Sequence, residues 1–142
     1  MKAWENFTTE FDDRTPIYRQ IYGLFSRSFA RGLIKTGERI PSIRDMALQL
    51  KVNANTMQRV YHEMERDGLI NSKRGTGYFF TEEKTMVEKV STKMAQESIG
   101  RFLEEMRSLG FADKDIVNEL SEQIKGEKRG GGHKDENNTF AS

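Results

Sequence analysis

The sequence predicts a mainly α-helical fold with one small β-hairpin, and three observations support this prediction. Apolar residues recur every three or four positions through most of residues 16–125, which is typical of helices that pack on a core. This period gives way to short extended runs around glycines only at residues 69–81. With 142 residues, the chain suits one domain or a domain plus a small appendage, and its 35% hydrophobic residues are enough for a small core but not for a large enzyme with a deep pocket.

The first predicted helix begins at Pro16, because a proline lacks the N–H that the first turn of a helix leaves unpaired. Thr15 is the expected N-cap, and Gly32 is placed to end the helix. The residues before this helix are mostly polar, so we expect an N-terminal arm that packs loosely or becomes ordered only on docking. The apolar positions are Trp4, Phe7 and Phe11 in the arm, and Ile17, Ile21, Leu24, Phe25 and Phe29 in the helix.

Two shorter helices follow, and a tight turn joins them. Ser42 is the expected N-cap of the first, where Asp45 can reach back as in a capping box, and Asn53 is the expected N-cap of the second. Helical spacing breaks at residues 51–53 and again at Gly68. The inner stripes are Ile43, Met46, Ala47 and Leu50 in the first helix, and Met57, Val60, Tyr61 and Met64 in the second.

Two helices joined by such a turn are typical of the helix-turn-helix, and the hairpin that follows makes a winged variant. In this unit the second helix lies in the major groove of DNA with its leading residues at the base edges. Amide side chains can bond two edges of adenine, an arginine can bond two edges of guanine, and a glycine-bearing wing can approach phosphates or enter a minor groove. The candidate DNA contacts are therefore Asn53, Asn55, Thr56, Gln58 and Arg59 in the helix, and Lys73, Arg74, Gly75, Thr76 and Gly77 in the wing.

The charge distribution agrees with a nucleic-acid-binding module joined to a second module. Residues 16–81 carry a net charge of +6, whereas residues 82–125 carry −3. A chance solvated face would look similar, so charge alone does not decide the function. The other arginines of the basic block, Arg19, Arg27, Arg31 and Arg39, are interpreted as surface charges of which one or two touch phosphate.

Composition excludes several kinds of chemistry. The sequence has no cysteine, which rules out disulfides, thiol catalysis and thiolate metal sites, and neither of its two histidines has a set of partner ligands nearby. We therefore predict no metal and no cofactor. No apolar run approaches the ~20 residues of a membrane helix and the N-terminus lacks a secretory signal, so we expect a cytoplasmic protein that does not contact a membrane.

Several separated motifs resemble the GntR family of winged helix-turn-helix transcriptional regulators, in register and without a gap over about residues 10–81. The short helical tail resembles the YtrA-like branch, which lacks a large effector domain. This resemblance implies a repressor of its own operon, often one that encodes an ABC-type transporter. The motifs are Pro16–Ile21 (PIYRQI), Gly32–Arg44, Val52–Glu65, Gly68–Ile70 and Gly75–Phe80.

The resemblance also implies roles for single residues. Arg44, inside a Pro-Ser-x-Arg motif, matches an arginine that typically contacts the operator, and Thr56 matches a phosphate or base contact. Gly75 and Gly77 match wing glycines that reach the minor groove. The family commonly has arginine where this sequence has Ala54, which cannot make a bidentate guanine contact, so the preferred operator is expected to differ from the usual half-site.

The chain after Glu82 predicts a long helix, interrupted at Gly110, and a shorter antiparallel helix that stops at Gly126. Their apolar stripe is interpreted as the seam of a two-fold homodimer, since two operator half-sites need two recognition helices; packing on the chain's own DNA-binding domain is the alternative. These helices leave little volume for a pocket, and the sequence identifies no small-molecule effector. The seam residues are Met94, Ile99, Phe102, Leu103, Met106 and Leu109.

The predicted organisation is a winged helix-turn-helix DNA-binding domain at 1–81 with an arm at 1–14, a helical dimerisation segment at 82–125 and a disordered tail at 126–142. The leading hypothesis is a homodimeric regulator of double-stranded operator DNA, and a repressor in particular because a repressor needs only to occupy its operator. A winged-helix module for protein interaction, without operator binding, is the alternative. An enzyme is remote, because no paired carboxylates, nucleophile–histidine pair or phosphate loop can be assembled from these residues.

Overall fold

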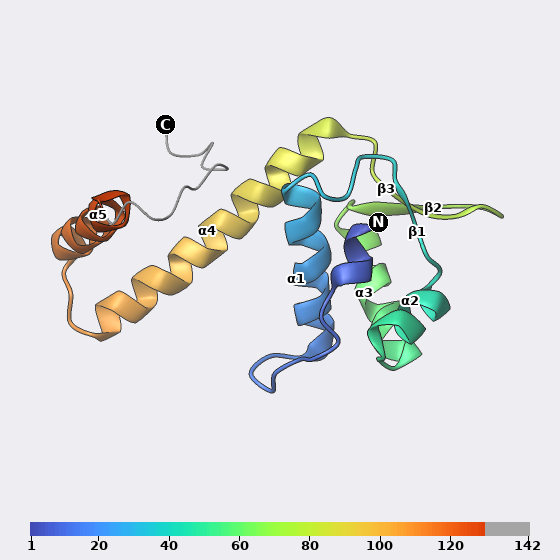
Figure 1. The fold of residues 1–142 in the computed structure, drawn as a ribbon, viewed down its shortest axis with the longest axis horizontal. Coiled ribbons are helices and arrows are strands. Elements are labelled where there is room, and N and C mark those ends of the chain that lie inside the picture. Colours follow the sequence, from blue (N-terminus) through green and yellow to red (C-terminus); the bar gives the residue numbers. More distant parts are fainter. Residues whose placement is uncertain (130–142) are drawn as a thin grey trace. The chain divides into compact units, whose positions relative to one another are not determined.

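The structure, a computed structural model, describes residues 1–129 of the chain (Figure 1). It divides into two compact units, Met1–Met94 and a second that begins at Ala95. The predicted mainly α-helical fold with a hairpin wing is confirmed. The elements are η1 (Ala3–Asn6), α1 (Ile17–Ala30), β1 (Arg39–Ile40), α2 (Ile43–Leu50), α3 (Ala54–Arg66), β2 (Ile70–Lys73), β3 (Gly77–Phe80), α4 (Lys84–Ser108) and α5 (Asp113–Arg129).

Two of the three predicted N-caps are present. The Ser42 hydroxyl accepts a hydrogen bond from the Asp45 N–H at 3.1 Å, and the Asn53 side chain accepts one from the Asn55 N–H at 2.7 Å. The cap predicted at Thr15 is wrong: Pro16 is the N-cap of α1 and has no side-chain hydrogen bond to offer. The Thr15 carbonyl instead accepts a hydrogen bond from the Gln20 side chain at 2.8 Å.

The core of the first unit forms where α1 and α2 each pack on α3, and α3 packs on the sheet. The predicted inner stripe of α3 is fully buried, and Phe29 of α1 stacks on Phe80 of β3 with ring centroids 5.1 Å apart. Ile17 was placed in the inner stripe of α1, but it lies at the exposed start of that helix and is 43% exposed. The buried residues from these helices include Ile21, Phe25, Phe29, Met46, Leu50, Met57, Val60, Tyr61 and Met64.

The sheet has three strands rather than the two of the predicted hairpin. Its order is β1-β3-β2, all antiparallel, and the register pairs Arg39 with Phe79 and Lys73 with Gly77. Strand β1 is only two residues long, so it has no alternating pattern that sequence analysis can detect. It forms because β3 offers it a partner on the side away from β2.

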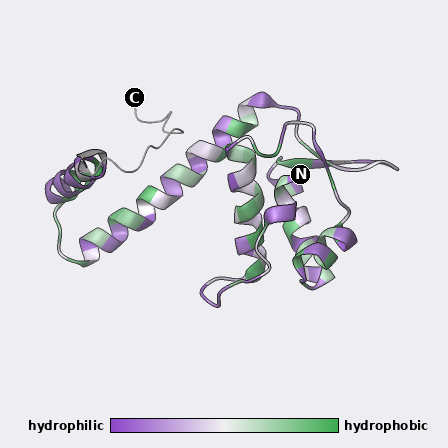
Figure 2. Ribbon diagram, viewed as in Figure 1, coloured by the Kyte–Doolittle hydropathy of each residue, from purple (hydrophilic) through white to green (hydrophobic). Residues whose placement is uncertain are grey.

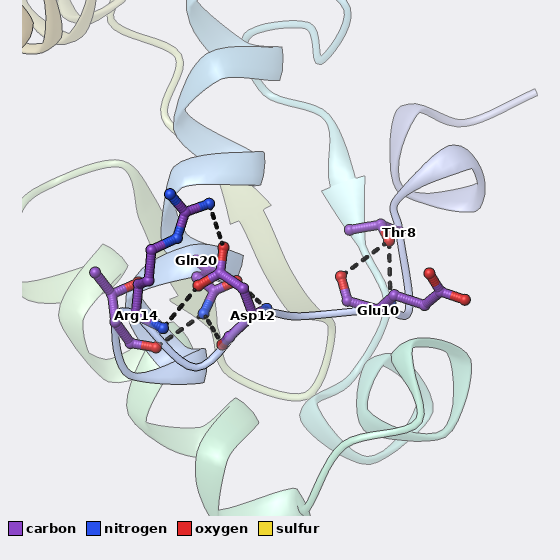
Figure 3. Close-up of polar contacts among 6 residues, drawn as sticks. Thr8, Glu10, Asp12, Arg14 and Gln20 are labelled. Carbon is purple, nitrogen blue, oxygen red and sulfur yellow. Dashed lines mark hydrogen bonds and ion pairs between the residues drawn. The ribbon is translucent and has the colours of Figure 1, made fainter.

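The N-terminal arm is packed, contrary to the expectation of a loose segment. Trp4 is 4% exposed and Phe7 contacts Phe25 edge-on at 5.1 Å, because large aromatic side chains gain more from burial than the arm loses in conformational freedom. Farther along, the Gln20 amide donates to the Asp12 carbonyl at 2.9 Å and accepts from the Asp12 N–H at 3.2 Å (Figure 3). The arm therefore belongs to the folded domain.

Helix α4 begins in the first unit, so the domain boundary predicted at residues 81 and 82 differs from the observed division. Val90 is buried in the core of the first unit, and Met86, Val87 and Met94 pack against that core. Met94 was predicted to lie in the dimer seam. In the single chain it is the last residue of the first unit, where it is half-buried against that core.

The second unit leaves apolar side chains exposed on both of its helices, and Figure 2 shows hydrophobic positions recurring along α4. Ile116 of α5 is buried, whereas the other apolar side chains of that helix stay exposed. Helix α5 also continues through Gly126 to Arg129, since good helix formers surround that glycine. The rest of the predicted tail lies outside the described residues. Exposed apolar residues are Ile99, Phe102, Leu109, Phe111, Val117, Leu120 and Ile124; Leu103 and Met106 are half-buried.

No helix in the described part of the chain combines the length and apolar character needed to cross a bilayer. Residues 1–129 also contain no group of three or more histidine, aspartate or glutamate side chains placed to hold a metal ion.

Candidate nucleic-acid interface

The leading end of α3 presents polar side chains to solvent. Asn53, Asn55 and Gln58 are exposed, whereas Thr56 is half-buried. The Asn53 oxygen is occupied by its capping bond to the Asn55 N–H, which leaves the Asn53 amide N–H groups for another partner. The positive end of the helix dipole lies at this terminus and favours a nearby anion such as a phosphate.

A tight turn of residues 51–53 sets the position of α3 against α2. Lys51 at this turn adopts a left-handed conformation with φ +57°, and its N–H bonds back to carbonyls of α2. Such a conformation usually favours glycine, so packing of the two helices holds a lysine in it. The helix pair thus has the geometry of the predicted helix-turn-helix.

Arg44 is the second residue of α2 and is exposed. Within residues 1–129 its side chain forms no hydrogen bond and no ion pair, so its guanidinium is available to an external acceptor. A cation in the first turn of a helix opposes the helix dipole, which argues against a purely structural role.

The wing is a hairpin whose tip, residues 74–76, projects beyond the sheet (Figure 1). Gly75 has φ +76° and Gly77 has φ +121°, values at which a side chain would be strained, so this turn requires glycine at both positions. The Lys73 ammonium lies 4.7 Å from the Phe79 ring centroid. Neither Lys73 nor Arg74 has a carboxylate partner within the described residues, so both charges are free to meet a phosphate.

Arg39 lies beside the wing, and the sequence analysis placed it only among the surface arginines of which one or two touch phosphate. A Cβ built on Gly77 would be 3.4 Å from the Arg39 Nε atom, so the missing side chain of Gly77 leaves room for this guanidinium. The cross-strand register that brings the two together joins residues far apart in the chain, and no local pattern reports it.

Arg59 differs from the other candidates because it is already engaged. Its guanidinium carbon lies 3.7 Å from the ring centroid of Tyr18, and its Nη2 donates to the Tyr18 hydroxyl at 3.0 Å. Arg19 donates to the same hydroxyl at 3.2 Å, and this hydrogen bond raises the pKa of Arg19. Sequence reasoning missed Tyr18, because it lies on α1 and meets α3 only in the folded chain.

A hydrogen bond between Tyr22 and Asp67 joins α1 to the end of α3 at 2.5 Å. Burial raises the pKa of Tyr22, and the Asp67 bond raises it further. Burial alone would raise the pKa of Asp67, but hydrogen bonds from Tyr22 and Arg66 outweigh it and lower that pKa. Asp67 is therefore an ionised acceptor that holds α1 against α3.

A polar helix end beside free cations, and a glycine-bearing wing, define a DNA-binding protein of the winged helix-turn-helix class. Residues 17–80 match the family described as "Bacterial regulatory proteins, gntR family". The chain belongs to this GntR family and is a DNA-binding transcriptional regulator rather than an enzyme.

Curated relatives and solved structures agree with this assignment. The uncharacterized HTH-type transcriptional regulator YhcF of Bacillus subtilis is 37% identical over 108 residues, which are 76% of this chain and 89% of that protein. The HTH-type transcriptional repressor YtrA of the same organism is 30% identical over 119 residues, 81% of this chain and 92% of that protein. A GntR-family transcriptional regulator from Listeria monocytogenes has a TM-score of 0.71 and 34% identity, with 79% of this chain and 98% of that chain covered.

Proposed function

We propose that the chain is a homodimeric repressor that occupies a two-part operator through α3 and the wing of each protomer. The observation that carries this proposal is the exposed, polar leading end of α3, with Arg44 on the preceding helix and free cations on the following wing. The helix end offers donors and acceptors for base edges, and the cations offer contacts to phosphate. The candidate contacts predicted from sequence remain the proposed ones, with Arg39 added.

Repression is proposed because occupancy of an operator is sufficient for it, and a relative covered over most of its length is named a repressor. The resemblance to the YtrA-like branch extends the proposal to the chain's own operon, with an ABC-type transporter among its products. No residue in the described part of the chain is assigned to an effector.

The exposed apolar side chains of the second unit support the homodimer. Ile99 is 55% exposed and Leu109 is 67% exposed, which is costly for a chain that stays monomeric. Ile99, Phe102, Leu103 and Met106 recur at helical spacing on α4, and Leu109 follows directly after the end of the helix, as expected of a seam between two copies. A dimer also doubles the number of phosphate contacts and so raises affinity at low salt.

Operator binding is tested by selection of duplexes from a random pool with the full chain, followed by gel-shift titration against random competitor at two salt concentrations. We expect a selected duplex to be retained specifically and to be released steeply as salt rises. The Arg44→Ala variant should weaken specific binding by about 1–3 kcal/mol if Arg44 reads a base. Retention of no duplex over competitor would refute operator binding and favour the protein-interaction module.

The seam is tested by sedimentation of the Phe102→Asp variant, which should be monomeric because it places a charge in the apolar stripe. Arg101→Asp is the matched control, since helical spacing puts Arg101 away from the stripe and the variant should stay dimeric. A Phe102→Asp protein that still sediments as a dimer would show that the copies meet elsewhere.

A further inference from the structure

Tyr18 is placed to immobilise an arginine of the recognition helix. Its ring is half-buried and packs against the core of the first unit, so its orientation is fixed by the fold. The Arg59 guanidinium stacks on this ring at 3.7 Å and donates to the hydroxyl at 3.0 Å. Two independent contacts from one anchored side chain therefore fix the end of a long, otherwise mobile arginine.

The stacked arginine can still bind a ligand. Stacking uses the flat face of a guanidinium, whereas its N–H donors point outward in the plane. The Arg59 side chain is 58% exposed, and its Nη1 group forms no hydrogen bond within residues 1–129. Glu63 has a carboxylate oxygen 4.0 Å from the Arg59 Nε atom, so it faces the Nε side of the fork and leaves the Nη1 side open.

The position of Arg59 indicates which part of a duplex it meets. It is the sixth residue of α3, one turn beyond Asn55 on the same exposed face and about 6 Å farther from the leading end. Base edges are read mainly by the first residues of such a helix. The contacts to Tyr18 hold the guanidinium on the side of α3 that faces α1, beside Arg19. Two cations at the flank of the helix are therefore better placed to bind backbone phosphates than to contact a base.

We propose that Tyr18 is a positioning residue that holds the Arg59 guanidinium for a backbone phosphate of the operator, with Arg19 as the second cation of the same site. This inference rests on the proposed operator binding and assigns affinity and sequence preference to different residues of α3. Arg59 contributes affinity without reading sequence, and the amides at the leading end of α3 carry the sequence preference. A pre-positioned arginine loses less freedom on binding than a mobile one, so Tyr18 raises affinity without touching DNA.

The test is a double-mutant cycle on the full chain, with a duplex recovered by selection with the wild-type protein and a random duplex as the two probes. Arg59→Ala should weaken binding to both duplexes by a similar factor of about ten and lower the slope of log affinity against log salt by about one. Tyr18→Leu should reproduce most of this loss, and the loss in the double variant should be clearly smaller than the sum of the two single losses, with a small remainder because Tyr18 also bonds Arg19. Tyr18→Phe keeps the ring but lacks the hydroxyl, so it should bind both duplexes more tightly than Tyr18→Leu and less tightly than the wild type.

The controls separate this site from general charge and from folding. Arg31→Ala removes an equal charge from the far end of α1 and should leave the salt slope nearly unchanged. Circular dichroism establishes that each variant is folded. If Tyr18→Leu does not fold, Tyr18→Phe takes its place in the test.

Two results would overturn the inference while operator binding stands. Independent, additive losses for Tyr18→Leu and Arg59→Ala would show that Tyr18 does not position Arg59. A loss of preference for the selected duplex in Arg59→Ala, with an unchanged salt slope, would show that Arg59 reads a base. Failure of the wild-type chain to retain any duplex is a different outcome, because it refutes the proposed function before any variant is made.

Discussion

The hydrogen bond from Tyr22 to Asp67 predicts a stability difference that depends on pH. Tyr22→Phe removes a donor 2.5 Å from a carboxylate that is ionised near neutral pH. Hydrogen bonds to charged groups contribute about 1.5–3 kcal/mol to the free energy of unfolding. The Asp67 side chain is 28% exposed, so water can replace part of the lost hydrogen bond, and the expected net loss is about 1 kcal/mol. The variant should therefore unfold at a lower urea concentration than the wild type at neutral pH.

The sign of the pH dependence follows from the pKa of Asp67. This pKa is lowered in the folded state, so the contribution is complete above the unfolded-state value of about 3.9 and is lost as pH falls through the lower folded-state pKa. Tyr22→Phe removes one cause of the lowering. The difference in unfolding free energy between wild type and variant should therefore narrow as the pH falls below about 4.

The assay is urea titration at several pH values, followed by the fluorescence of Trp4, the sole tryptophan of the sequence, which is buried in the same unit. Tyr61→Phe is the matched control, because the Tyr61 hydroxyl donates to the neutral Pro41 carbonyl at 2.7 Å. Its loss of stability should be the same at every pH. A Tyr22→Phe difference that stays constant down to acid pH would refute the assigned role of Asp67.

Three further predictions concern backbone and core, each measured by thermal or urea unfolding with circular dichroism. Gly77→Ala should destabilise by about 1–3 kcal/mol because of its φ of +121°, whereas Gly100→Ala, in open space on α4, should stabilise by up to about 1 kcal/mol; equal effects would contradict the backbone argument. Asn53→Ala should cost about 1 kcal/mol through the lost cap, and no change would mean that the cap is redundant. Met64→Ala should cost about 2–5 kcal/mol, since Met64 is fully buried, and a cost below 1 kcal/mol would indicate a core that collapses around it.

Local features of the fold could be predicted because each is encoded within a few residues. The caps at Ser42 and Asn53, the buried stripe of α3 and the glycine turn of the wing all depend on residues two to four positions apart. Strand β1 and the burial of Trp4 could not be predicted, because both depend on partners far away in the chain. The extent of α5 was underestimated, since Gly126 costs a helix only about 1 kcal/mol and its neighbours restore that.

The candidate interface likewise has features that could be predicted from the sequence and features that could not. The exposure of Asn55, Gln58 and the wing cations follows from helical spacing and turn chemistry, so their places were predicted. The contact of Tyr18 with Arg59 spans 41 positions and depends on how α1 packs against α3, which no short motif records. The expected DNA contacts themselves remain predictions for the binding experiments.

The burial of Trp4 has a practical consequence for any attempt to transfer the winged helix-turn-helix domain of this protein to another scaffold. The family signature spans residues 17–80, but the interior that supports it also takes Trp4 and Phe7 from before that span and Val90 from after it. A graft trimmed to the signature would lose the Phe7 ring that contacts Phe25 and the Val90 side chain that is buried in the same core. The segment that should be transplanted is therefore the whole compact unit, residues 1–94.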